Sequence, residues 1–216
     1  MIPSYRDRFH AGIVLADHLV AYADTTATIL AIPNGGVAVA APMVAKLKLV
    51  LDLIIVRKIP LPGTTEAGFG SVASDGTIFL NQSLLDRLRL SQKDIDAGAR
   101  KVLEEIRQRM ESYGVRGNYE AIRGCTAILV DDGLASGITM EAAVYAVKQY
   151  DPLEIVVAVP TASAQAVERI SPLVTRIICP NIRHGPYFAV AEAYQNWYDL
   201  TAEEVISILA ERSGNI

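Results

Sequence analysis

The sequence predicts an α/β protein built on a doubly wound, mostly parallel sheet with helices on both faces. Segments typical of strands and of helices alternate from residue 28 to residue 180, which is the pattern of parallel sheets. The strand segment 51–58 is apolar on both faces, as in a sheet that helices cover on both sides. The 216 residues, 51% of them hydrophobic, are enough to bury the core of one large domain.

The first expected element is an amphipathic helix over 4–22 with Ser4 as its N-cap. Its apolar face is set by residues at helical spacing: Phe9, Ile13, Ala16 and Val20. The alternation that follows predicts strands at 28–32, 51–58, 125–130, 153–160 and 174–180, and helices at 37–47, 91–113, 138–150 and 162–170. Pro42 must lie in the first turn of its helix or bend it. Ser91 with Asp94, and TAEE from Thr201, are typical of helix starts.

Residues 59–76 interrupt this alternation. The segment IPLPGTTEAGFGSVASDG is rich in Gly, Pro, Ser and Thr and has no periodicity. It predicts a loop that leads into a short pair of strands around 70–73 and 77–81. Because long loops in compact domains are usually functional or disordered, we expect this one to matter for function.

We expect a single domain over 1–216, with a core of about 25–180 and a small cap in which 1–24 and 181–216 pack together. The net charge of −4 gives no electrostatic reason to expect nucleic-acid binding. No apolar run approaches the roughly 20 residues of a membrane-spanning helix, and the N-terminus does not resemble a signal peptide. The expected protein is soluble and cytoplasmic, with neither nucleic acid nor membrane as a partner.

The most informative segment is residues 128–139, ILVDDGLASGIT. Asp131 and Asp132 end an apolar strand, where buried charge is costly unless it is paired or used. Small residues and then a helix follow, and backbone amides at such a helix start form an anion site. Carboxylates beside a phosphate site can accept hydrogen bonds from vicinal hydroxyls, so the segment predicts a ligand of the ribose 5-phosphate type at the carboxyl edge of the sheet.

Other interpretations of this segment are open from the residues alone. An acid pair can simply be a solvated strand end before a capped helix. The segment lacks the Asp-x-Asp spacing of a phosphoryl-accepting aspartate, and the sequence has neither a Gly-x-Ser-x-Gly elbow nor a Walker lysine loop. A hydrolase or phosphatase of another α/β family is therefore the least favoured class.

ILVDDGLASGIT resembles the phosphoribosyl pyrophosphate (PRPP) signature of type I phosphoribosyltransferases. That signature has four apolar residues, two acids, two mostly apolar positions, and then small, small, Gly, any residue and Ser or Thr; only Gly133 departs, at a usually branched position. A second resemblance, to a poorly characterised branch of predicted phosphoribosyltransferases, covers nearly the whole chain. It is carried by YRDRFHAG, VRK, VDDG and AVAEAYQNWYDLTAEEV.

This resemblance implies Mg²⁺-dependent transfer of the 5-phosphoribosyl group from PRPP to a small nitrogenous, nucleobase-like acceptor, with release of pyrophosphate. Asp131 and Asp132 would be catalytic, holding the ribose hydroxyls and contacting the metal through water, and Glu66 would shuttle a proton. The residues implied to bind the ribose and 5-phosphate also include Ala135, Ser136, Gly137, Ile138 and Thr139. Those implied to bind pyrophosphate are Asn34, Gly35, Gly36, Arg57 and Lys58.

The resemblance also gives roles to larger segments. Loop 59–76 would close over the active site, and the chain ends would form a hood that selects the acceptor. The implied partners are PRPP and the acceptor, and dimerisation is common among the relatives, so a homodimer is expected.

Two positions bear on activity. The branch usually has Pro-Arg-Gly-Gly where this chain has PNGG at 33–36, so Asn34 removes a bidentate, permanently charged contact to pyrophosphate. Purine-salvage members carry an aspartate as proton acceptor where Ala135 stands, which disfavours oxopurine acceptors. A non-catalytic regulator that binds PRPP or a nucleotide is therefore the alternative to an enzyme.

Overall fold

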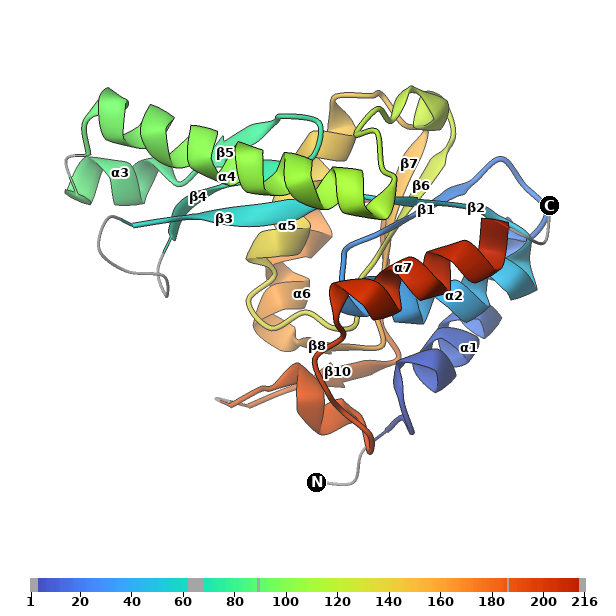
Figure 1. The fold of residues 1–216 in the computed structure, drawn as a ribbon. Helices are drawn as coiled ribbons and strands as arrows, with labels where there is room; N and C mark the ends of the chain where they lie inside the picture. Colours follow the sequence, from blue (N-terminus) through green and yellow to red (C-terminus); the bar gives the residue numbers. More distant parts are fainter. Residues whose placement is uncertain (1–3, 62–67, 89, 186, 214–216) are drawn as a thin grey trace.

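The fold is seen in a computed structural model that describes residues 4–61, 68–88, 90–185 and 187–213 (Figure 1). A five-stranded parallel sheet in the order β2-β1-β6-β7-β9 forms its centre. Its strands are β1 (Thr28–Ala31), β2 (Val50–Leu53), β6 (Thr126–Val130), β7 (Glu154–Ala158) and β9 (Arg176–Ile178). The predicted α/β class is thereby confirmed.

Helices cover both faces of this sheet, as predicted. They are α1 (Arg8–His18), α2 (Gly35–Leu47), α5 (Ile138–Lys148), α6 (Ala164–Ile170) and α7 (Ala202–Ser213). Alternate residues of β1 enter different cores: Ile29 and Ala31 pack into a cluster with residues of α1 and α2, and Leu30 into one with residues of α5 and α6. This period of two explains why the strands are apolar on both faces.

The first helix differs from its prediction. It begins at Arg8, and its N-cap is Asp7, whose Oδ1 accepts a hydrogen bond from the His10 amide at 2.8 Å, so the Ser4 cap was wrong. A 3-10 turn, η1 (Val20–Tyr22), follows it. Of the predicted apolar face only Ala16 is buried, because Phe9 is 53%, Ile13 37% and Val20 57% exposed. The buried face consists of Arg8, Ala11, Gly12, Leu15 and Ala16.

Small residues explain this rotation of α1. A Cβ atom on Gly12 would lie 2.0 Å from the carbonyl oxygen of Val39 and 2.6 Å from Cγ of Pro42. Helix α1 therefore packs directly against the backbone of α2, which a face of larger side chains would prevent. Pro42 lies well inside α2, not in its first turn.

The predicted strand 51–58 is wrong as a single strand. Its second half is β3 (Val56–Pro60), which belongs to a separate antiparallel sheet with β4 (Gly68–Ala73) and β5 (Ile78–Leu80). The chain crosses between the sheets at Ile54 and Ile55, whose amides bond to the carbonyl of Ala31 and to Oγ of Ser74. The predicted strand pair before residue 81 is confirmed, and β4 begins earlier than expected.

A long helix, α4 (Gln92–Tyr113), covers this second sheet and begins with the predicted Ser91–Asp94 capping box. The short helix α3 (Gln82–Leu88) before it was not predicted. In Figure 1, α4 and the sheet β3-β4-β5 form a layer above the carboxyl edge of the central sheet. Residues 62–67 of the predicted loop lie outside the described residues, and Glu66 lies among them.

Segments near the two ends of the chain contact each other. Tyr5 and Tyr194 form a bridge, and the amide of Gln195 donates to the carbonyl of Tyr5 at 2.8 Å. Strands β8 (Thr161–Ser163) and β10 (Asn181–Arg183) pair beside them. The remaining 3-10 turns are η2 (Glu120–Ile122), η3 (Ser171–Leu173) and η4 (Val190–Ala193). The role of these ends in selecting an acceptor stays a prediction.

The predicted start of the last helix is confirmed: Thr201 and Glu204 bond reciprocally through backbone and side chain before α7. Among the helices that the structure describes, none is both long and apolar enough to cross a membrane.

Candidate functional site

The order of the central strands locates a ligand site. From β1 the chain passes through α2 to β2 on one side, and from β6 it passes through α5 and α6 to β7 and β9 on the other. Strands β1 and β6 are therefore neighbours whose connections diverge, and α/β proteins bind ligands at such a switch point, outside the carboxyl ends of the strands. The loops that leave these two ends are residues 33–36 and 131–137.

The two loops are in direct contact. A Cβ atom built on Gly35 would lie 1.8 Å from Oδ2 of Asp132, and one on Gly36 would lie 2.6 Å from the carbonyl oxygen of Val130. Only glycine permits this approach at both positions. The structure thus brings together the acid pair and the PNGG loop, which are about 100 residues apart in the sequence.

Arg8 of α1 is a site residue that the sequence analysis missed. Its Nε donates to Oδ2 of Asp132 at 2.8 Å, and its Nη1 donates to the carbonyl of Tyr198 at the same distance. The guanidinium carbon lies 3.8 Å from the centre of the Trp197 ring, within the range of a cation–π contact. The side chains of Arg8 and Asp132 are only 8% and 16% exposed. Helical spacing gives no reason to place Arg8 inside the protein. Its burial in the structure identifies it as a site residue.

The acid pair has a strongly perturbed electrostatic environment. Burial raises the pKa of Asp131 well above its usual value, and the charge of Asp132 raises it further. Burial also raises the pKa of Asp132, whereas the Arg8 guanidinium opposes this shift. Of the two carboxyl groups, Asp132 is thus the one with a positive neighbour, the Arg8 guanidinium at 2.8 Å. The backbone of the pair is fixed by Tyr194, whose hydroxyl donates to the Asp132 carbonyl at 2.6 Å.

The segment predicted to hold the 5-phosphate leads into α5. Gly137 has φ of +76°, a left-handed conformation that favours glycine, and the first amide of the helix, that of Ile138, donates to Oγ of Ser136 at 3.4 Å. The predicted positions around it, Ala135, Ser136, Ile138 and Thr139, are exposed. Leu134 fixes the start of the segment by bonding with Thr161 and Ser163 of β8. An exposed helix start of this kind suits an anion.

Gly133, the one departure from the PRPP signature, has a local explanation. A Cβ atom there would lie 2.6 Å from Cγ1 of Val190. Val190 of η4 thus takes the space that a branched side chain at position 133 would fill.

Asn34, in the PNGG loop, forms side-chain hydrogen bonds with three residues of other segments. Its Oδ1 accepts hydrogen bonds from Nη2 of Arg109 and, at 2.9 Å, from the hydroxyl of Tyr113, both on α4. Its Nδ2 donates to the carbonyl of Leu200 at 2.6 Å. The peptide bond between Pro33 and Asn34 is cis. The uncharged Asn34 thus has an arginine from another element as its neighbour.

The remaining predicted pyrophosphate residues lie on β3. Arg57 is exposed and its Nε lies 3.5 Å from Oε2 of Glu105 on α4. Adjacent residues of a strand point to opposite faces, so Lys58 faces away from α4, and its stem lies across Gly68. The predicted roles of Arg57 and Lys58 stay predictions, as does that of Glu66.

The residues of the site suit a weakly held divalent metal. Among the described residues, no group of three or more His, Cys, Asp or Glu side chains is positioned to hold a metal ion. Mg²⁺ is often bound by one or two carboxylates with water and substrate phosphates completing its shell. Asp131 and Asp132 supply two hard carboxylates, one oxygen of which is engaged by Arg8, so they fit a metal that arrives with its substrate.

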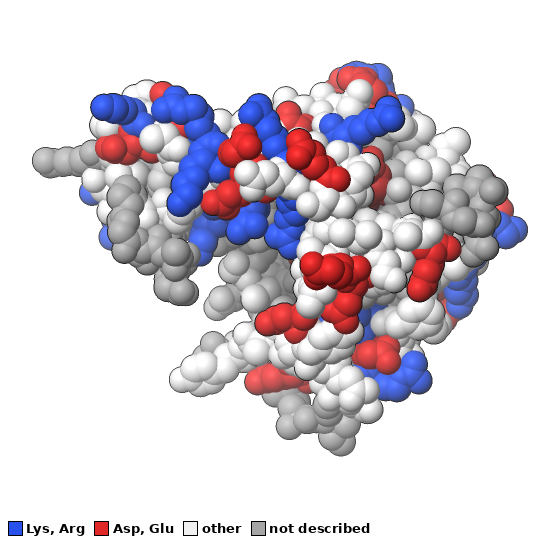
Figure 2. Space-filling view, viewed as in Figure 1, with Lys and Arg blue, Asp and Glu red and all other residues white. Residues whose placement is uncertain are grey.

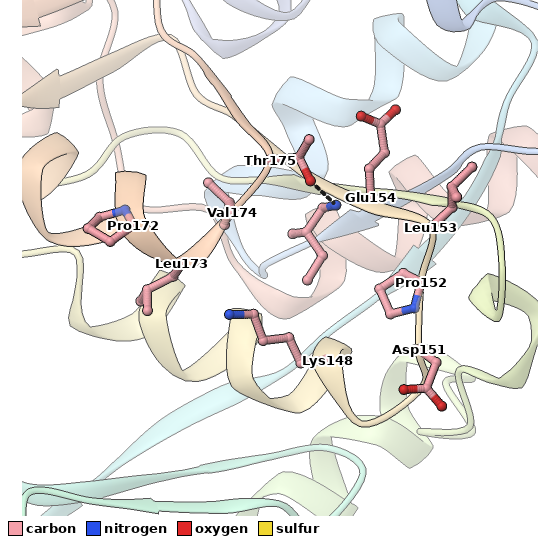
Figure 3. A pocket seen from close by; sticks show the side chains of 10 residues that line it. Lys148, Asp151, Pro152, Leu153, Glu154, Pro172, Leu173, Val174 and Thr175 are labelled. Atoms are coloured by element: carbon pink, nitrogen blue, oxygen red, sulfur yellow. Dashed lines mark hydrogen bonds between the residues drawn. The ribbon is translucent and has the colours of Figure 1, made fainter.

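The structure has one cavity far from the acid pair and another on the far side of Arg8, the partner of Asp132. One of about 360 Å³ sits at the opposite edge of the sheet, between Glu154 at the start of β7 and Lys148 at the end of α5 (Figure 3). It contains none of the predicted site residues. Another of about 420 Å³ lies between α1, α2 and the segment around Tyr198, with Arg8 in its wall.

The fold and the switch-point loops define an α/β protein with a ligand site at the carboxyl edge of its parallel sheet. Comparison with known families makes this specific: the chain belongs to the phosphoribosyl transferase domain family, whose model matches residues 10–197. The resemblance found in the sequence is thereby confirmed.

Individual relatives support this family. The crystal structure of TT1426 from Thermus thermophilus has a TM-score of 0.81 at 35% identity, covering 98% of this chain and 99% of that one. Two Mycobacterium tuberculosis proteins, MT0597 of strain CDC 1551 and Rv0571c of strain H37Rv, are provisionally named phosphoribosyl transferases. Each is 31% identical over 205 residues, which are 95% of this chain but 46% of the relative. The chain thus spans about half the length of these curated relatives.

Proposed function

We propose that this chain transfers the 5-phosphoribosyl group from PRPP to a ring nitrogen of a small, nucleobase-like acceptor, in the presence of Mg²⁺. In the reaction, the bond from C1 of the ribose to the pyrophosphate oxygen breaks, a C1–N bond forms, and the acceptor nitrogen loses a proton. The products are a phosphoribosylated acceptor, pyrophosphate and a proton. Membership of the phosphoribosyl transferase domain family supports this reaction class.

The observation that carries the proposal is the packing of the acid pair onto the glycine loop at the switch point. Asp132 lies over Gly35, so a ligand that bonds to the carboxylates also meets the amides at the start of α2. Asp131 and Asp132 would accept hydrogen bonds from the ribose hydroxyls, 135–139 would bind the 5-phosphate, and 33–36 would bind the pyrophosphate. When bound, Mg²⁺ would be held by Asp131 and Asp132 through water and would neutralise phosphate charge.

The remaining predicted parts belong to the same proposal. Arg57 and Lys58 would add positive charge near the pyrophosphate, and Glu66 would move the proton from the acceptor. The segments 1–24 and 181–216 would form the hood around the acceptor. Oxocarbenium character at C1 is stabilised mainly by positioning and by fixed charge, and excluding water protects the activated sugar from hydrolysis.

The first experiment is a calorimetric titration of the purified chain with PRPP, with and without Mg²⁺. We expect micromolar, metal-dependent binding, followed by pyrophosphate release when the right nucleobase-like acceptor is added. A folded chain that does not bind PRPP would contradict the proposal. PRPP binding without release for any acceptor would support the alternative, a non-catalytic PRPP-binding regulator.

Asp132→Asn tests the site itself. We expect pyrophosphate release to fall by about 100-fold or more, since a charged group that acts at the transition state is lost, while the circular dichroism spectrum stays native. The control is Asp151→Asn, which changes a carboxylate that is 79% exposed and pairs with Arg123. Unchanged turnover in Asp132→Asn would remove the acid pair from the mechanism.

A further inference from the structure

The contacts of Arg109 do not account for its positive charge. It lies on α4, and its Nε and Nη2 donate to the Tyr113 hydroxyl and to Oδ1 of Asn34. Both acceptors are neutral. Among the described residues, no carboxylate lies within ion-pair distance of Arg109, although Arg8, Arg57 and Arg107 each have one. A half-buried guanidinium held only by neutral groups leaves its charge uncompensated.

The positive charge of Arg109 lies at the loop predicted to bind pyrophosphate. Asn34 is the residue before α2, so the side chain that Arg109 contacts belongs to the loop at the start of that helix. The loop has glycines that allow close approach of a ligand but no cation of its own. A guanidinium has five donors in a planar fork, and Arg109 uses two of its nitrogens on Tyr113 and Asn34. Donors therefore remain for an oxyanion that binds beside the loop.

The wider surface is consistent with an anion at this place. Figure 2 shows Lys and Arg side chains gathered along the lower edge of the layer formed by α4, above a hollow in the surface. Arg57 and Lys58 of β3, both exposed, belong to the strand that packs on α4. The carboxylate of Glu105 partly offsets the charge of Arg57. Arg109 differs from Arg57 because its guanidinium bonds directly to the loop, at Asn34.

We propose that Arg109 binds the pyrophosphate group of PRPP, supplying from α4 the guanidinium that the 33–36 loop lacks. This inference rests on the proposed function and names a residue of its donor site. Asn34 then has a positioning role: its Oδ1 fixes one nitrogen of Arg109, and its Nδ2 ties the loop to the carbonyl of Leu200.

The test compares three probes on the same chain: PRPP, inorganic pyrophosphate and ribose 5-phosphate, each titrated by calorimetry with Mg²⁺. In Arg109→Gln, we expect the Kd for PRPP and pyrophosphate to rise about 10- to 100-fold, as for loss of a charged hydrogen-bond donor. The Kd for ribose 5-phosphate should change by less than about twofold, because that ligand lacks the pyrophosphate group. Arg109→Lys, which keeps the charge without the fork, should give an intermediate loss.

Two controls separate binding from a structural effect. Arg107→Gln alters a neighbouring arginine of α4 that pairs with Glu104, and all three affinities should stay at the wild-type level. Asn34→Ala removes the anchor and keeps the guanidinium, so it should weaken pyrophosphate binding less than Arg109→Gln does. A larger loss in Asn34→Ala would overturn the proposal in favour of a purely structural Arg109.

The remaining outcomes are also decisive. Equal losses of PRPP and ribose 5-phosphate in both Arg109 variants, or no loss in either, would overturn the role of Arg109 and leave the proposed function intact. A wild-type chain that binds none of the three probes would instead contradict the proposed function, and the inference with it.

Discussion

Two loops meet at the carboxyl edge of the central sheet, and each is contacted by an arginine from a helix distant in the sequence. Arg8 reaches Asp132 across 124 positions, and Arg109 reaches Asn34 across 75. The first contact is a buried ion pair, closed over by Trp197 and the Tyr198 carbonyl. The second ends on a neutral amide.

The difference concerns where each loop obtains its counter-charge. The acid-pair loop contains the carboxylate that Arg8 pairs with, Asp132, so this arginine has its counter-charge within the protein. The Asn34 loop contains no charge, and no carboxylate of the described residues pairs with Arg109, so an anion that binds there would supply the counter-charge. The Arg8–Asp132 ion pair should therefore matter mainly for the free energy of unfolding. Arg109, whose contact with the loop is to a neutral amide, should matter mainly for ligand affinity.

The largest effect on stability is expected from Arg8→Ala. This change leaves the Asp132 carboxylate buried without its partner, which typically costs about 3–5 kcal/mol. The free energy of unfolding from urea titration measures the loss. Arg8→Ala combined with Asp132→Asn should recover part of it, because the unpaired charge is then absent.

The matched control is Arg6→Ala, two residues earlier. Arg6 pairs with Asp7 at 2.9 Å, but its side chain is 62% exposed, and exposed pairs contribute about 0–1 kcal/mol. Similar losses of unfolding free energy for Arg6→Ala and Arg8→Ala would show that the Arg8–Asp132 ion pair is not formed in solution. The contrast between the two loops would then be wrong.

A smaller loss of stability is expected where the loops touch. In Gly35→Ala the new Cβ would meet Oδ2 of Asp132 at 1.8 Å, and such overpacking costs about 1–3 kcal/mol. Because the Asp132 carboxylate must move, PRPP affinity measured by calorimetry should fall as well.

Gly124→Ala is the control for Gly35→Ala. Gly124 has φ of +66°, and a Cβ atom there would meet only open space, at a position far in the sequence from the PNGG loop. Its replacement should cost about 1–2 kcal/mol through backbone strain alone and leave PRPP affinity unchanged. If Gly35→Ala behaves in the same way, the two loops do not act on one ligand.

The smallest effects come from removing one hydroxyl at each loop. Tyr194→Phe takes away the partner of the half-buried Asp132 carbonyl and should lower the free energy of unfolding by about 1–2 kcal/mol. Tyr113→Phe takes away one of two donors on Asn34 Oδ1 and the acceptor of Arg109 Nε, but Arg109 still serves that oxygen and its side chain is only half-buried. Its cost should be about 0.5 kcal/mol. The reverse order in urea titrations would contradict the assignment of the acid-pair loop as the more tightly held one.

The sequence predicted those parts of the protein whose chemistry is local. The alternation of strands and helices, the capping boxes at Ser91 and Thr201, and the strand that ends at Asp131 all follow from neighbouring residues. The alternation also placed the PNGG loop and the acid pair at the carboxyl edge of the sheet, but their contact depends on β1 and β6 being neighbours, which only the structure gives.

The sequence could not predict contacts that depend on packing between distant elements. Arg8 has the spacing of a surface residue, and its burial depends on Gly12 bringing α1 against α2. Segment 51–58 contains neither Gly nor Pro, so nothing local marks the crossing at Ile54 into a second sheet. Arg109 lies among other charged residues of α4, and its contact with Asn34 depends on how the second sheet sits above the first.

The hydrogen bond from Arg8 to the Tyr198 carbonyl joins residues 190 positions apart. During synthesis, Arg8 leaves the ribosome before the central strands, whereas its carbonyl partner and the Trp197 ring emerge only after those strands have been made. Contacts of such long sequence separation form late because closing the chain between them costs entropy. We therefore expect the core sheet to form before Asp132 acquires its complete surroundings, so that a nascent chain gains its ligand site as one of the last steps of folding.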